Sequence, residues 1–366
     1  MGTKDIHGEE FTEETLMKLD IFEKYLESWL PVFINQKRVD EINIFDLFAG
    51  PGEDPIGQTG SPIRILDVIS KYQPQIQIRK CKINVILNDK DKKKAEQLKG
   101  EVESYKKEKL NSLNEYINVE VHSEDFSSIF FKYVEGRFQT TPNLFFLDQN
   151  GIKEITNEVF KKLESLQRTD FMFFISSSFV NRFGTTSSFK KYFPKIKSTK
   201  YFEIHRDLLN YYRSLLSTNS RLMLYPFSIK KGCNIYGLIF GSHHPLGVGK
   251  FLSIAWDKNK INGEANFDID EDKKKEQQTL PLFEPVKLTK IEKFESELRD
   301  YILSRQKISN KEIYDFAIGN GHIPKHAKKL LEQLKKEDRI NHYQYDKISY
   351  VNCYKNKEII YFTIKK

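Results

Sequence analysis

The stretch IFDLFAGPGE, residues 44–53, decides the fold. It contains the end of an apolar run, a carboxylate at Asp46, and a turn in which Gly50 and Gly52 flank Pro51. Glycine lets the backbone adopt a positive φ and approach a ligand without a Cβ in the way, and proline stiffens the turn. A buried strand that ends in a carboxylate and a glycine turn is a common ligand site at the carboxyl edge of an open α/β sheet.

The spacing of this turn argues against a dinucleotide site. The pattern D-x-x-x-G-x-G lacks the third glycine of G-x-G-x-x-G, and residues 53–60 intervene before the helix start at Ser61. A dinucleotide pyrophosphate normally rests directly on the helix N-terminus. The pattern instead resembles motif I of the class I S-adenosylmethionine (SAM) methyltransferases, although a glycine turn occurs in many α/β proteins. We expect the methionine end of SAM to be held by Asp46 and by the backbone of Phe48, Ala49, Gly50 and Gly52.

Two later apolar runs are also followed by acidic residues. The run INVILNDKD (83–91) ends at Asp89, which we expect to bind the ribose hydroxyls of an adenosine cofactor, with Asn88 as the alternative. Asp125 follows a short strand in residues 117–130 and is placed to accept a hydrogen bond from an adenine amino group. Aspartate is also a favoured N-cap, so either acid could instead cap the helix that follows it.

The fourth strand is predicted from PNLFFLDQNG (142–151). This strand end is where methyltransferases usually place the residues that face the methyl acceptor, so Asp148 and Asn150 are the candidate catalytic residues. They would accept hydrogen bonds from an acceptor amine or position it for in-line attack, so that catalysis is mainly proximity and orientation. Acids at four successive strand ends support a SAM-type site more strongly than any one of them.

The remaining elements complete an α/β pattern. Helical spacing across residues 12–30, with Thr12 as N-cap and Pro31 as the end, predicts a helix before the first strand. Residues 169–183 predict a fifth strand, and residues 221–242 predict a hairpin. The expected fold is a Rossmann-like class I methyltransferase sheet, mostly parallel, with an antiparallel final hairpin.

Composition limits the other classes of function. At 366 residues the chain is long for one core, which predicts about two domains. It has no long uncharged apolar run and no signal-peptide pattern, so we expect a cytoplasmic protein without a membrane span. Cys81, Cys233 and Cys353 are far apart and form no C-x-x-C pair, which predicts free thiols and no metal site.

The basic charge lies mainly at the C-terminal end. The net charge is +8, and residues 287–366 carry 18 Lys and Arg against 11 Asp and Glu, or 18 − 11 = +7. Residues 271–286 are polar and end near two prolines, so we expect them to link a methyltransferase-like domain (1–270) to a winged-helix domain (287–366).

The C-terminal pattern is typical of a winged helix. Amphipathic helices are predicted at residues 291–303, after the capping box Ser309–Glu312, and at residues 323–340, followed by two or three strands in residues 338–366. A basic third helix can enter a DNA major groove. The alternative is a winged helix that contacts protein or shapes an active-site cleft. The candidate nucleic-acid residues are Lys325, His326, Lys328 and Lys329.

Several segments together resemble the three-Cys-motif partner protein (TcmP) family. They are FDLFAGPG with TGSPIRILDVI, the FFLDxxG element, SSSFVNRF, the segment from His205 to Leu209, and residues 244–270. The resemblance implies a class I methyltransferase-like fold and a partner, a radical-SAM-like protein with a three-cysteine motif. The family's usual Asp-Pro-Phe-Gly is Asp148-Gln149-Asn150-Gly151 here. Losing the proline and the aromatic removes a stiff turn and a stacking surface, which weakens the expectation of base-amino methylation.

The sequence therefore predicts a SAM-dependent methyltransferase-like protein that acts on or at nucleic acid, with DNA as the expected partner. The intact glycine turn and the four acids favour an enzyme. The altered DQNG element favours the alternative, a non-catalytic DNA-binding adaptor that retains the methyltransferase fold.

Overall fold

The computed structural model describes residues 10–135, 140–149, 151–176, 204–231, 234–272, 288–341 and 347–365. The chain divides into two compact units, Met1–His243 and His244–Lys366. The predicted linker, residues 271–286, lies almost entirely outside the described residues. The expected domain boundary there stays a prediction.

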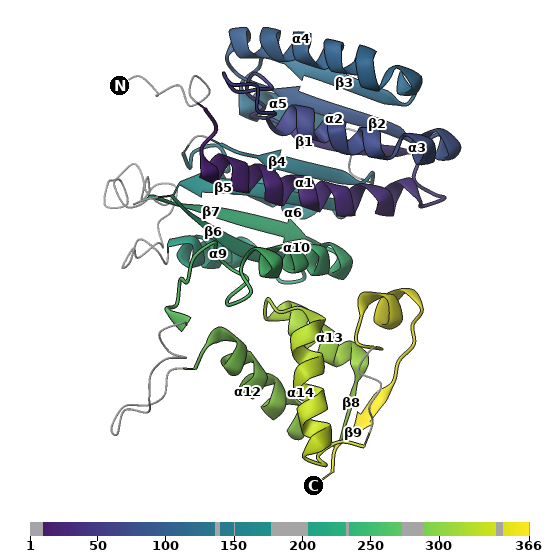
Figure 1. Cartoon of the computed structure of the whole chain (residues 1–366), viewed down its shortest axis with the longest axis vertical. Helices are drawn as coiled ribbons and strands as arrows, with labels where there is room; N and C mark the ends of the chain where they lie inside the picture. The colour runs from purple at the N-terminus through teal and green to yellow at the C-terminus, as the bar shows by residue number, and fades with distance from the viewer. Residues whose placement is uncertain are drawn as a thin grey trace. The chain divides into compact units, whose positions relative to one another are not determined.

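A single seven-stranded sheet forms the N-terminal unit in the described part of the chain, in the order β3-β2-β1-β4-β5-β7-β6 (Figure 1). The first five strands are parallel, and the last two form an antiparallel hairpin whose turn, residues 232–233, is not described. This is the strand order of class I methyltransferases and confirms the predicted fold class. The strands are β1 (Glu41–Asp46), β2 (Lys82–Asn88), β3 (Ile117–His122), β4 (Asn143–Leu147), β5 (Thr169–Ser176), β6 (Met223–Lys231) and β7 (Asn234–Ser242).

Helices cover both faces of the sheet, as nearly continuous apolar parallel strands require. One face carries α1 (Glu13–Ile34), α2 (Ser61–Lys71), α3 (Gln73–Arg79) and α4 (Lys92–Lys109) (Figure 1). The other carries α5 (Phe126–Val134), α6 (Asn157–Ser165) and α9 (Ile204–Leu215). Their buried side chains pack with those of β1, β4 and β5 into one aromatic-rich core.

The first helix does not end at Pro31 as predicted. Thr12 caps its N-terminus as expected, but the helix continues through Pro31 to Ile34. Proline lacks the N–H that would bond to the carbonyl of Glu27, which normally makes it a helix breaker. Here the Tyr72 hydroxyl donates to the Glu27 carbonyl at 2.8 Å, so the freed acceptor is satisfied by another element.

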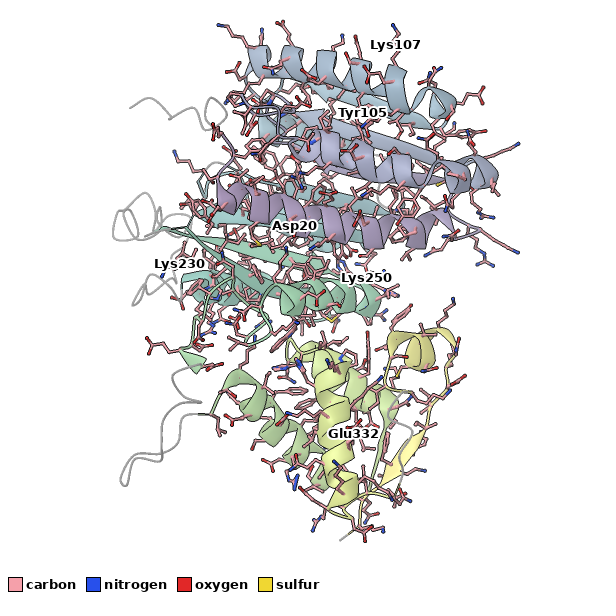
Figure 2. The ribbon with its side chains drawn as sticks, viewed as in Figure 1. Asp20, Tyr105, Lys107, Lys230, Lys250 and Glu332 are labelled. Atoms are coloured by element: carbon pink, nitrogen blue, oxygen red, sulfur yellow. The ribbon has the colours of Figure 1, made fainter. Side chains whose placement is uncertain are left out.

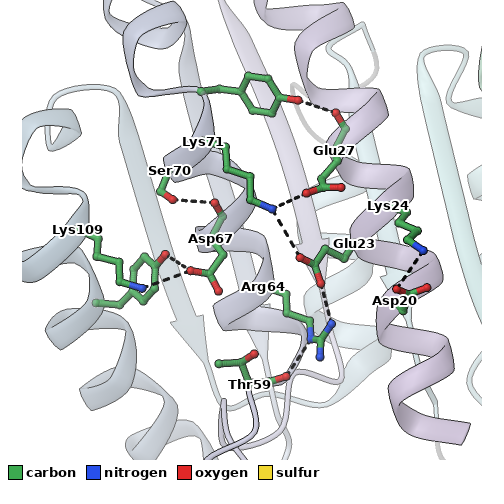
Figure 3. Close-up of polar contacts among 12 residues, drawn as sticks. Asp20, Glu23, Lys24, Glu27, Thr59, Arg64, Asp67, Ser70, Lys71 and Lys109 are labelled. Atoms are coloured by element: carbon green, nitrogen blue, oxygen red, sulfur yellow. Dashed lines mark hydrogen bonds and ion pairs between the residues drawn. The ribbon is translucent and has the colours of Figure 1, made fainter. Parts of the chain in front are cut away.

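Ion pairs and hydrogen bonds connect α1, α2 and α4 (Figure 3). Arg64 of α2 donates to Glu23 of α1 at 2.7 Å and to the Thr59 carbonyl at 3.0 Å. Lys71 pairs with both Glu23 and Glu27. These bonds fix α2, and with it the start of that helix, relative to α1.

A ladder of buried amides crosses the sheet in register. Asn84, Asn43 and Asn143 lie side by side on β2, β1 and β4. Asn84 donates to Asn43 at 2.8 Å, Asn43 donates to Asn143 at 2.9 Å, and Asn143 donates to the Thr169 hydroxyl at 3.0 Å. A one-residue slip of any strand would break this chain and bury unpaired amides, so the ladder specifies register.

The C-terminal unit contains the predicted helices. They are α12 (Lys290–Leu303), α13 (Asn310–Gly319) and α14 (Pro324–Lys336). The unit also contains α10 (Pro245–Lys258). The capping box is confirmed, because Ser309 and Glu312 bond each other's backbone N–H groups. Trp256 of α10 donates to the Gly321 carbonyl at 2.9 Å.

The predicted two- or three-stranded ribbon at residues 338–366 is partly wrong. β9 (Tyr361–Thr363) is its only described strand, and it pairs with β8 (Lys307–Ser309) ahead of α13. Val351–Lys355 form a helical turn instead. This turn buries Cys353 and is started by the Ser349 hydroxyl, which accepts from the Asn352 amide at 3.3 Å.

Candidate functional site

The glycine turn after β1 closes on itself. Gly50 and Gly52 have φ values of 65° and 99°. The Gly60 amide donates to the Gly52 carbonyl at 2.7 Å, and a Cβ on Gly60 would lie 2.9 Å from that oxygen. Residues 53–60 therefore form a loop whose two ends lie next to each other. The N-terminus of α2 lies next to the turn, although the sequence separates the two by eight residues.

Asp54 organises this loop. Its carboxylate accepts hydrogen bonds from the amides of Phe11, Ile56 and Gln58 at 2.8–3.1 Å. Burial opposes the ionisation of Asp54, but the backbone hydrogen bonds outweigh burial and lower the pKa of Asp54. The bond from Phe11 also ties the segment before α1 to the turn. Asp54 was not predicted from the sequence, where it is one of two acidic residues, with Glu53, between Gly52 and Gly60.

Asp46 is fully buried at the end of β1, with 0% of its surface exposed. One carboxyl oxygen accepts from the Phe48 amide at 3.3 Å, and the other, Oδ2, has no hydrogen-bond partner. Burial, with smaller contributions from the nearby acids Asp148 and Asp89, outweighs the Ser61 and Phe48 hydrogen bonds and raises the pKa of Asp46 to about 7. An unpaired buried carboxyl oxygen surrounded by other acids favours a cationic ligand group.

Asp89 holds the glycine turn. Its carboxylate accepts from the Gly50 amide at 3.0 Å and from the Asp91 amide at 2.8 Å. Asp91, and not Asp89, is the N-cap of α4 and accepts from the Lys93 amide. The helix-cap interpretation of Asp89 is therefore wrong, and each of its oxygens keeps a lone pair for a ligand.

Asn88, the alternative to Asp89, is committed to the backbone. Its side-chain oxygen accepts from the Glu124 amide, and its nitrogen donates to the carbonyls of Leu47 and Glu124. These bonds join the carboxyl ends of β1, β2 and β3. We therefore assign Asn88 a structural role.

Asp125 occupies the N-cap position of α5, but its side chain makes no capping hydrogen bond. It pairs instead with Lys90 at 2.8 Å, and both side chains are exposed. Burial raises the pKa of Glu154, and the nearby Asp125 raises it further. Asp125, Lys90 and Glu154 thus form a charged group beside the ends of β2 and β3.

Asp148 is bound by a lysine that sequence reasoning missed. Lys18 of α1 donates to both carboxylate oxygens of Asp148, at 2.8 and 3.1 Å. Its signal in the sequence is the pair Glu14 and Lys18, spaced i, i+4 on the otherwise apolar buried stripe of α1. Burial opposes a charged Lys18, but Asp148 and Glu14 outweigh it and raise the pKa of the lysine.

The residues after Asp148 are described only in part. Asn150 lies outside the described residues. Gln149 is buried, and its Oε1 accepts from the Glu154 amide at 2.9 Å, whereas its Nε2 has no partner. A polar side chain therefore replaces the proline that the resemblance predicts there.

The candidate nucleic-acid residues on α14 separate into two groups. Lys325 and Lys329 are exposed, Lys328 is half-buried, and Lys329 pairs with Glu295 at 3.2 Å. His326 instead packs against the Trp256 ring, with its Nδ1 3.0 Å from that of His322. Burial, with smaller contributions from neighbouring lysines, lowers the pKa of His326 to about 4. His326 is therefore neutral at pH 7 and cannot neutralise a phosphate.

Neither a membrane-spanning helix nor a metal cluster occurs among the described residues. No helix in this part of the chain is long and apolar enough to cross a membrane. No three His, Cys, Asp or Glu side chains in the described ranges are grouped to hold a metal ion.

Comparison with protein families matches residues 266–342 to the GMT-like wHTH domain. A comparison with curated protein sequences finds no match. Among solved structures, the putative methyltransferase yhhF from Escherichia coli has 14% identity and a TM-score of 0.33, covering 67% of this chain and 92% of its own. The METTL16 methyltransferase domain has 12% identity and a TM-score of 0.27, covering 60% of this chain and 66% of its own.

A putative class I SAM-dependent methyltransferase from Listeria monocytogenes has 9% identity and a TM-score of 0.26, covering 66% of this chain and 62% of its own. Because these TM-scores are low, the fold assignment rests on the strand order and not on them. The protein is a methyltransferase-like α/β protein with a C-terminal winged helix-turn-helix domain.

Proposed function

We propose that the N-terminal unit binds SAM and that the whole chain methylates nucleic acid, which the winged-helix domain binds. The observation that carries this proposal is the convergence of Asp46, Asp89 and Asp148 at one sheet edge. Their charges act on one another, and the Oδ2 of Asp46 lacks a partner. Ligands of open α/β sheets bind at this edge.

The residues present fit SAM. Asp46 would accept a hydrogen bond from the ammonium of the methionine end, and the turn from Phe48 to Gly52 would approach it closely. Asp89 would accept from the ribose hydroxyls and Asp125 from the adenine amino group. SAM supplies the methyl group, and the protein binds and orients both reactants.

Titration calorimetry with S-adenosylhomocysteine (SAH) tests the cofactor site. We expect binding by the wild type, a loss of at least about tenfold in affinity for Asp46→Asn and Asp89→Asn, and no loss for Asp91→Asn. Asparagine caps helices as well as aspartate does, so the Asp91 variant is a matched control on the same edge. Absence of SAH binding by the wild-type protein would remove the proposal.

The nucleic-acid part rests on the winged helix-turn-helix domain and on the exposed lysines of α14. DNA is the expectation from sequence, and electrophoretic shift assays with DNA and RNA of matched sequence distinguish the two. The three-cysteine radical-SAM-like partner remains a proposal, and copurification of the two proteins would test it. A protein that binds nucleic acid but not SAH would be the adaptor of the alternative hypothesis.

A further inference from the structure

The ion pair between Lys18 and Asp148 points to the chemical class of the methyl acceptor. Lys18 Nζ lies within hydrogen-bond distance of both Asp148 oxygens, and it lies 3.7 Å from Glu14. It also lies 4.9 Å from the centre of the Phe174 ring and 5.1 Å from that of Tyr236. The lysine side chain is 9% exposed, whereas that of Asp148 is 26% exposed. Asp148 can therefore meet a substrate, and Lys18 acts on the substrate through it.

This arrangement suits a hydroxyl better than an amine. Asp148 can accept the single O–H bond of a hydroxyl, because each carboxylate oxygen keeps a lone pair beside the bond that it accepts from Lys18. Methylation of a neutral amine leaves positive charge on nitrogen, which a neighbouring ammonium group disfavours. Methylation of a hydroxyl builds negative charge on oxygen as the proton leaves, and the same ammonium group favours it.

The winged helix-turn-helix domain narrows the choice of hydroxyl. Within a nucleic-acid strand, the ribose 2′-hydroxyl is the hydroxyl that each RNA nucleotide carries and that DNA lacks. We propose that Asp148, held by Lys18, is the proton acceptor for an RNA ribose 2′-hydroxyl. This inference rests on the proposed function and replaces the amine acceptor expected from the sequence.

Methyl transfer to the hydroxyl needs no reactant other than SAM and the RNA. The hydroxyl O–H bond breaks and its proton moves to Asp148. The oxygen electron pair forms the new bond to the methyl carbon, while the carbon–sulfur electron pair returns to sulfur. Asp148 then releases the proton to solvent. Lys18 is a positioning residue that orients Asp148 through two hydrogen bonds, beside the acidic residues Asp46 and Glu14.

Labelling identifies the acceptor. The purified full chain is incubated with radiolabelled SAM and total cellular RNA, and the RNA is hydrolysed with alkali. A 2′-O-methyl group blocks cleavage of the adjacent phosphodiester, so we expect the label in alkali-resistant dinucleotides. Total cellular DNA should stay unlabelled. Label in mononucleotides, label in DNA, or no labelled RNA from a protein that binds SAH would each overturn the inference, and a protein that does not bind SAH would fail the proposed function itself.

Variants separate the roles of the two residues. Asp148→Ala should lose labelling by about 100-fold or more, in the range of general-base catalysis, with SAH affinity unchanged. Lys18→Met should lower the labelling rate at saturating RNA with SAH affinity unchanged, because Asp148 is no longer held in place, and Lys18→Arg should restore part of that rate. A purely structural Lys18 would lower the yield of folded protein without lowering the labelling rate of the folded fraction. Lys71→Met, which removes a more exposed ion-paired lysine on α2, is the control and should change neither quantity.

Binding gives a measurement independent of turnover, and one that does not need the Lys18 variant to fold. In the presence of SAH, the wild type should bind a fluorescent random-sequence RNA 20-mer more tightly than the same DNA. Asp148→Ala should reduce that preference. An unchanged RNA-to-DNA ratio in this variant would contradict a contact between Asp148 and the 2′-hydroxyl.

Discussion

The buried carboxyl group of Asp46 lowers the stability of the folded protein when no ligand is bound. The pKa of Asp46 is raised from 3.8 to about 7, chiefly by burial. The folded state therefore binds the proton more tightly than the unfolded state, and stability is lost as pH rises from about 4 through about 7. Each pKa unit corresponds to about 1.4 kcal/mol, so the whole effect is on the order of 4 kcal/mol.

Thermal melts of wild type and Asp46→Asn at pH 5 and pH 8 test this prediction. The asparagine variant carries no charge, so we expect its stability advantage over wild type to be larger at pH 8 than at pH 5. Burial also raises the pKa of Asp170, to about 6, but Asp170 is present in both proteins and cancels in the difference. Equal differences at the two pH values would show that Asp46 is ionised in the folded protein.

Gly60 is predicted to matter for ligand binding because its Cβ would meet backbone. Gly60→Ala would push the Gly52 carbonyl away from its 2.9 Å approach and open the closed turn. We expect at least about a tenfold loss of SAH affinity in calorimetry. Gly100→Ala is the control, because Gly100 of α4 faces open space. It should keep full affinity and gain roughly 0.5–1 kcal/mol of stability from helix propensity.

At the scale of elements, the amide ladder predicts a large effect of one buried side chain. Asn43→Leu would remove two buried hydrogen bonds and leave Asn84 to donate only to Glu41, and the Asn143 oxygen to accept only from Thr141. We expect a loss of about 1–3 kcal/mol in urea unfolding, because each lost hydrogen bond contributes about 0.5–1.5 kcal/mol. Asn118→Leu, at the exposed end of the same register, should stay within about 0.5 kcal/mol of wild type. A small effect at Asn43 would mean that the ladder does not set the register.

The elements that could be predicted from sequence are those whose signal is local. Apolar runs ending in acids located the first four parallel strands, and Ser309 with Glu312 located the start of α13. The end of α1 was predicted wrongly at Pro31, because the hydrogen bond that satisfies the Glu27 carbonyl comes from Tyr72, which is distant in sequence. The ribbon at residues 338–366 was over-predicted because an alternating pattern also allowed the helical turn at Val351–Lys355.

The candidate site was predictable at its strand ends and not in its pairings. The sequence placed Asp46, Asp89 and Asp148 at one edge, but it could not show that Asp91 caps α4 or that Lys18 binds Asp148. Lys18 precedes Asp148 by 130 residues, and only the folded sheet brings them together. His326 was likewise predicted to belong to the basic face of a helix, whereas its ring packs against Trp256.

For the whole molecule, we expect nucleic-acid affinity to depend on salt through the exposed lysines of α14. Replacing Lys325 and Lys329 by Gln should lower affinity and reduce the slope of log affinity against log salt by up to about one for each phosphate that is no longer neutralised. Lys107 projects from α4 in the other unit (Figure 2), and Lys107→Gln is the matched control. Because the pKa of His326 is about 4, its protonation should add nothing to binding between pH 6 and 8. Fluorescence anisotropy across a salt series measures both quantities. An unchanged slope in the α14 variant would mean that the nucleic-acid surface lies elsewhere on the chain. The slope reports counterion release, which depends on the lysines that neutralise phosphate.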